Sequence, residues 1–170
     1  MGGYPDAEWP PVEGTAAETH WNGFANFYTN KISEGTLRIE GGSFHVHAAD
    51  LRVGQQGVGR VVVGAQGSCV VQNILLDTNS SAVVRFEFGP EGLGTLQATN
   101  ALTINPGAKL EVDASAYTGD AVWVKLIDCA SRTGAFAPED IEVIGRGSVR
   151  QDVDEDIWLH RPIGTVLFLN

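Results

Sequence analysis

The chain has 170 residues, a formal net charge of −10 and 43% hydrophobic residues. Its length fits one domain of ordinary size, its acidity disfavours binding to the phosphate backbone of nucleic acid, and its apolar runs are too short to cross a bilayer or to form the core of a signal peptide. The two cysteines, Cys69 and Cys129, allow one disulfide and lie in apolar contexts that suit buried free thiols at least as well.

Residues 1–34 differ from the rest of the chain because they combine several prolines with aromatic side chains. Proline fixes φ and removes a donor, so this segment is not expected to form a long helix. We expect an irregular N-terminal cap whose aromatic residues cover the open end of a stacked sheet. In the alternative, Trp21 and Tyr28 form a surface on which sugars stack.

Residues 35–77 contain the same pattern twice. Gly35 begins a run of short alternating segments that returns at Gly59, and a weaker third copy begins at Gly94. A repeat of about two dozen residues, built from short strands and glycine-rich turns, is typical of a β-solenoid, in which each turn of the chain (a coil) stacks on the one before. The spacing predicts that Leu37 covers Val61 and that Leu51 covers Leu75, in both cases with parallel strands.

The remaining sequence continues in short strands separated by turn signals. A longer strand over residues 80–88 interrupts the repeat, which indicates either a wider coil or a side hairpin. A nine-residue strand is expected over residues 121–129, followed by shorter strands up to residue 169. We therefore predict an all-β protein with one solenoid domain over residues 35–170, a right-handed parallel β-helix. The alternative is an antiparallel jelly roll or cupin-like barrel.

The second half of the chain resembles bacterial repeat-bearing surface and secreted proteins related to autotransporter passengers, of the type found in planctomycete and verrucomicrobial genomes. The resemblance is a pattern of strands and turns and spans roughly residues 35–160. The segments that carry it are Val84-Arg-Phe-Glu-Phe, Gly94-Thr-Leu-Gln-Ala, residues 102–113, Val124-Lys-Leu-Ile-Asp-Cys, Thr133-Gly-Ala-Phe and Asp156-Ile-Trp-Leu. It implies a right-handed parallel β-helix, a secreted or cell-surface location and no known catalytic activity.

Two histidines form the sharpest local motif. His45 and His47 are at i and i+2, so they share one face of a strand, where two imidazoles could hold a metal ion as in a cupin. The third histidine of a cupin site is missing, because Thr95 occupies its place. With Arg52, the two histidines are also candidates for sugar binding, and the alternative is a pair of exposed histidines without a ligand.

The acidic segment near the C-terminus is a candidate calcium site. Asp152, Asp154 and Asp156 alternate as at the start of a calcium-binding loop, although the glycine of such a loop is absent. A solvated acidic turn explains the same residues.

The leading functional hypothesis is a non-enzymatic, secreted or surface-associated structural or binding module that self-associates through a solenoid end or an edge strand. Stacked strands leave unpaired backbone groups at the last coil, and the apolar C-terminal segment Val166, Leu167, Phe168 and Leu169 is the candidate docking strand. A carbohydrate-active enzyme or carbohydrate-binding module is the second hypothesis, and a metal-binding cupin-like barrel is the third.

Overall fold

The computed structural model describes residues 19–20, 34–55, 57–77 and 82–162. About 66% of these described residues are in strands. The elements are β1 Thr19–His20, β2 Glu34–Val53, β3 Val58–Leu76, β4 Ala82–Glu87, β5 Thr95–Ile104, β6 Lys109–Asp113, β7 Trp123–Thr133, a 3-10 turn Pro138–Asp140, β8 Ile141–Ile144, β9 Ser148–Arg150 and β10 Ile157–His160. Within these ranges there is no helix with the length and apolar character needed to span a membrane.

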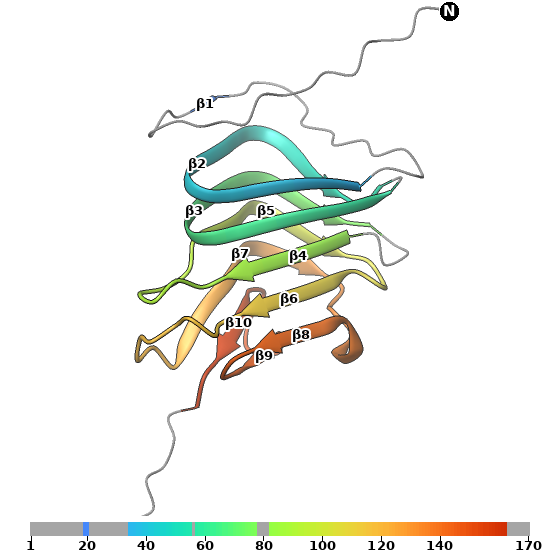
Figure 1. Ribbon diagram of the computed structural model, residues 1–170. Coiled ribbons are helices and arrows are strands. Elements are labelled where there is room, and N and C mark those ends of the chain that lie inside the picture. Colours follow the sequence, from blue (N-terminus) through green and yellow to red (C-terminus); the bar gives the residue numbers. More distant parts are fainter. Residues whose placement is uncertain (1–18, 21–33, 56, 78–81, 163–170) are drawn as a thin grey trace, which may run out of the picture.

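The strands stack in parallel as a β-solenoid of about four turns (Figure 1). β2 pairs with β3, β3 pairs with both β4 and β5, and these continue into β6, β7 and β8, always in the parallel sense. Among the described strands, antiparallel pairing occurs only where β10 joins β7 and β9. The parallel β-helix is therefore confirmed over the alternative of an antiparallel jelly roll or barrel.

Each coil contributes rungs to three ladders, which we number in chain order. The first ladder contains residues 34–39, 58–63, 82–87, 109–113 and 141–144; the second contains 41–46, 66–71, 95–98 and 127–129; the third contains 50–53, 73–76, 101–104 and 131–133.

The register between the first two coils changes from ladder to ladder. Leu37 lies over Val61, as predicted, but Leu51 lies over Ile74 and not over Leu75. The one-residue difference follows from burial: Ile74 is 1% exposed, whereas Leu75 is only half-buried. Because side chains alternate in a strand, a slip of one residue would exchange the buried and exposed faces. The first coil absorbs the extra residues between Val46 and Asp50, where the register shifts.

The third coil begins earlier than the repeat predicts. β4 pairs in parallel with residues 59–63 of β3 and with β6, so it forms the first ladder of that coil and is not a side hairpin. The segment starting at Gly94 supplies only the second and third ladders, through β5. The coil starts at Ala82, which pairs with Gly59, and the turn between Phe88 and Gly94 then makes this coil wider than the first two.

Inward-facing apolar residues of consecutive coils form the core. In the first ladder Val63, Phe86 and Val112 are at most 1% exposed and lie directly beneath one another. Cys69 and Cys129 are both buried free thiols, and they belong to different stacks of the second ladder. Burial raises the pKa of Cys69 to about 12 and that of Cys129 to about 11, because a thiolate is poorly solvated in an apolar core.

Beneath β7, the C-terminal end of the solenoid is closed by chain segments that change direction. β10 runs antiparallel beneath β7, and β9 pairs with the far side of β10. Arg132 takes the position under Leu102 and donates hydrogen bonds to the backbone oxygens of Gln151 and Asp156. In the third ladder, the stack that contains the buried Leu102 therefore ends with the charged side chain of Arg132.

At the other end, β1 pairs in parallel with residues 44 and 45 of β2. The rest of the predicted N-terminal cap lies outside the described residues.

Candidate functional site

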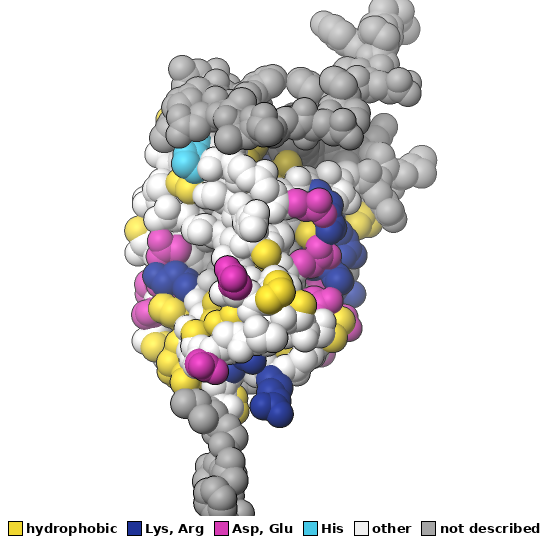
Figure 2. Space-filling model, turned by 60° about the vertical axis from the view of Figure 1, so that its left-hand side comes forward, with side chains coloured by type: hydrophobic (Ala, Val, Ile, Leu, Met, Phe, Trp, Pro, Cys, Tyr) yellow, Lys and Arg dark blue, Asp and Glu magenta, His cyan; other side chains and the backbone are white. Residues whose placement is uncertain are grey.

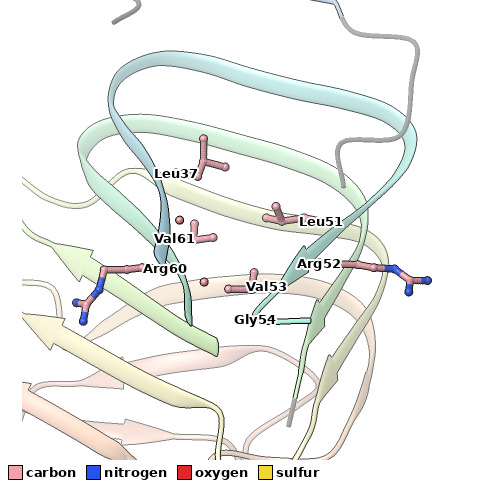
Figure 3. Close-up of a pocket in the computed structure, with 9 residues that line it drawn as sticks. Leu37, Leu51, Arg52, Val53, Gly54, Arg60 and Val61 are labelled. Carbon is pink, nitrogen blue, oxygen red and sulfur yellow. The ribbon is translucent and has the colours of Figure 1, made fainter. Parts of the chain in front are cut away.

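The predicted histidine and arginine site lies on the outer surface of the first coil. His45 is half-buried on the second ladder, stacked over Val70, while the side chain of His47 lies outside the described part of the chain. Arg52 belongs to the third ladder, and its Nη2 lies 3.6 Å from Oδ2 of Asp50. Arg52 and Arg60 point away from the coil on opposite sides (Figure 3), so adjacent coils do not bring these two cations together.

Between Arg52 and Arg60 the first two coils leave a small hollow lined mainly by aliphatic side chains and glycines. Leu37, Leu51 and Val61 point into the space between the ladders, whereas both arginine heads point outward (Figure 3). The hollow is therefore part of the apolar core. None of the residues labelled in Figure 3 directs a polar side chain into it.

Several predicted positions cannot be placed. Trp21 and Tyr28, the aromatic sugar-binding candidates, and Val166, Leu167, Phe168 and Leu169, the candidate docking strand, all lie outside the described residues.

The three carboxylates of the predicted calcium site have separate partners in the chain. Asp152 accepts two hydrogen bonds from Arg150, at 2.8 and 2.6 Å, which lower the pKa of Asp152 to about 2. Asp154 Oδ1 accepts from the Trp158 indole at 2.8 Å. Asp156 is 8% exposed and accepts from the Cys129 amide at 2.8 Å. The described side chains include no group of three or more histidine, cysteine, aspartate or glutamate residues placed to hold a metal ion. Calcium binding therefore stays a prediction.

An exposed aromatic surface is formed where β10 pairs with β7. The antiparallel register puts His160 opposite Trp123 and Trp158 opposite Lys125. The Trp123 ring centroid lies 4.3 Å from that of His160, and Trp158 meets Trp123 edge to face at 6.4 Å. Trp123 is 43% exposed. We call Trp123, Trp158 and His160 the aromatic platform.

Two cations beside the aromatic platform, Lys125 and Arg150, are bound to carboxylates. Lys125 Nζ lies 2.7 Å from Asp128 and 2.6 Å from Asp156, and these hydrogen bonds raise the pKa of the ammonium group. The same Nζ lies 5.0 Å from the centre of the Trp158 ring, a distance typical of a cation–π contact. On the other side of Trp158, Arg150 lies opposite it on β9 and is paired with Asp152.

A second charged surface follows the outward side of the first ladder. Arg38 of the first coil reaches Glu87 of the third at 2.5 Å, and Arg60 of the second reaches Glu111 of the fourth at 2.7 Å. Arg85 also contacts Glu87 and Glu111, at 2.8 and 3.2 Å. Figure 2 shows basic and acidic side chains interleaved along one side of the molecule. These pairs neutralise one another between coils, so we assign this surface to stabilisation of the stack. Each pair contributes about 0–1 kcal/mol.

The first ladder ends at β8, the outermost strand of the sheet order. β8 pairs with β6 along one edge, and no other described strand pairs with its second edge. Ile144, the last residue of β8, is 43% exposed. This edge has the backbone geometry that can add a further strand.

The sequence placed Trp123 and Trp158 in strands but did not indicate that they meet. The usable signal was the i, i+2 spacing of Trp158 and His160, which puts both on one face of β10. The pairing of that face with Trp123 depends on the antiparallel return of the chain after β9, for which the local sequence gives no sign.

Comparison of the chain with protein-family models, with curated proteins and with solved structures finds no match. The resemblance to autotransporter passengers thus depends on the pattern of strands and turns alone and stays a prediction.

Proposed function

We propose that this protein is a non-enzymatic β-solenoid module with a structural or binding role, secreted or attached to a cell surface, which self-associates through the end of its sheet. The observation that supports self-association most directly is the strand β8. It lies at the end of the sheet order, and its terminal side chain Ile144 is 43% exposed.

The physical argument starts from the unpaired edge. A parallel sheet continues wherever a strand in the right direction is offered, because each added strand satisfies the free N–H and C=O groups of the previous one. In the described part of the chain, β8 has such an edge. A second copy packed there would also cover Ile144, which is 43% exposed, and burial of this exposed part contributes about 1 kcal/mol.

The proposed location is supported by the resemblance to surface and secreted repeat proteins. The net charge of −10 favours solubility and opposes nonspecific association.

Light scattering coupled to size-exclusion chromatography tests the association. We expect the full chain to show a mass above that of the monomer, and Ile144→Lys to lower it. Val153→Lys is the matched control, because Val153 is 54% exposed but lies outside the strands. An oligomer unaffected by Ile144→Lys, or a wild-type protein that is monomeric at millimolar concentration, would contradict the edge mechanism. Deletion of residues 163–170 tests the C-terminal docking strand in the same assay.

The alternative of a carbohydrate-active enzyme makes a different prediction. Incubation with acidic and neutral polysaccharides would then produce new reducing ends or unsaturated products, which a non-enzymatic module does not.

A further inference from the structure

We propose that the aromatic platform is a binding site for a neutral glycan, with one pyranose ring stacked on the exposed face of Trp123. This site uses residues other than those of the β8 edge and does not depend on self-association. The argument has three parts: the preorganisation of the ring, its polar surroundings and the local charge.

The Trp123 ring is held in place before any ligand binds. His160 packs against it with ring centroids 4.3 Å apart and planes inclined by 36°, and Trp158 meets it edge to face. Trp158 is itself fixed by the hydrogen bond from its Nε1 to Asp154 at 2.8 Å. A rigid aromatic surface loses little conformational entropy on binding, which favours the weak, shallow contacts typical of sugar recognition.

The surroundings of Trp123 suit a sugar better than a protein partner or a membrane. The other exposed large hydrophobic residues of the described chain are Val58, Ile144 and Val153, none of which is on β7 or β10. Trp123 is thus a single apolar ring flanked by polar groups, with Lys125 two residues along β7 and Ser148 opposite His160 on β9. A pyranose has an apolar face of C–H groups and a rim of hydroxyls, and this arrangement complements both parts.

The charges around the platform select against an acidic glycan. Lys125 is bound by Asp128 and Asp156, and Arg150 is bound by Asp152, so neither basic group is available without breaking an ion pair. The net charge of −10 further repels polyanions. The complementary ligand is therefore uncharged.

The experiment uses the full chain with uncharged hexasaccharides of β-linked glucose, mannose and galactose, and with hexagalacturonate as the anionic probe. Titration calorimetry measures affinity, and two-dimensional ¹H–¹⁵N spectra follow the indole N–H signals of the four tryptophans, assigned by single Trp→Phe variants. We expect at least one neutral hexasaccharide to bind and to shift the Trp123 signal. Trp123→Ala should weaken binding on the order of tenfold, whereas Trp123→Phe, which keeps a ring, should retain most of the affinity.

Ile144→Ala is the matched control for exposed apolar area, since Ile144 is as exposed as Trp123 but lies on the β8 edge. The proposal is overturned by any of four results: no binding of the three neutral probes at millimolar concentration, binding that survives Trp123→Ala, shifts confined to the other tryptophans, or tighter binding of hexagalacturonate. The indole shifts are measured on the wild-type protein, so the test remains decisive even where a variant is unstable.

Discussion

The close stacking of the first two coils predicts that Gly67 cannot be replaced, even by alanine. A Cβ atom built on Gly67 would lie 2.1 Å from the carbonyl oxygen of Ile39 in the coil above and 2.8 Å from its carbonyl carbon. The contact is with backbone, so no side-chain rotation relieves it. Gly67→Ala would therefore force the two coils apart at the corner between their first and second ladders.

The size of the effect follows from this geometry. To bring the new methyl group to an acceptable contact, the Ile39 carbonyl and residue 67 must separate by about 1 Å. Inserting a methyl group into a well-packed site costs about 1–3 kcal/mol, and the rigid neighbour here puts the cost at the upper end. Replacing glycine also restricts the unfolded chain, which returns about 0.4–1 kcal/mol. The net loss is about 2 kcal/mol, equivalent to a fall of about 4–8 °C in Tm for a chain of this size.

Thermal unfolding followed by circular dichroism measures this loss. Gly41→Ala is the control, because a Cβ at Gly41 meets no atom within 4 Å, and we expect its stability to stay within about 0.5 kcal/mol of wild type. If Gly67→Ala and Gly41→Ala melt at the same temperature, residue 67 does not approach the Ile39 carbonyl and the packing of the two coils at this corner is wrong.

Three further predictions follow from other contacts. Asp156→Ala should lower the free energy of unfolding by about 1–3 kcal/mol in a denaturant titration, because it leaves the buried Cys129 amide without its acceptor. Hydrogen bonds from the Ser115 hydroxyl and amide lower the pKa of Asp113. Their contribution to the free energy of unfolding is therefore present above the unfolded-state pKa of Asp113 and is lost as the pH falls through the folded-state pKa. Denaturant titrations at neutral and acidic pH should show wild type more stable than Ser115→Ala at neutral pH, with a smaller difference in acid. Cys69 and Cys129 should resist a thiol-specific reagent at pH 8 in the native protein and react after denaturation, since burial raises the pKa of both thiols; rapid labelling of native Cys69 would contradict its place in the core.

Much of the architecture could be read from local patterns. The 24-residue return from Gly35 to Gly59, the alternation of apolar and polar side chains and the glycine-rich turns predicted parallel coils, and Leu37 does lie over Val61. These features are local because a strand has a period of two and a turn is specified by the few residues within it.

The exact stacking and the candidate site required the tertiary structure. Constant spacing put Leu51 over Leu75, whereas the bulge before Asp50 moves it to Ile74, and the widened third coil begins at β4 and not at Gly94. Trp123 and His160 meet only because the chain reverses after the fourth coil and pairs β10 antiparallel to β7. Contacts between residues so far apart along the chain depend on how complete coils and their turns pack, and no local period in the sequence specifies that packing.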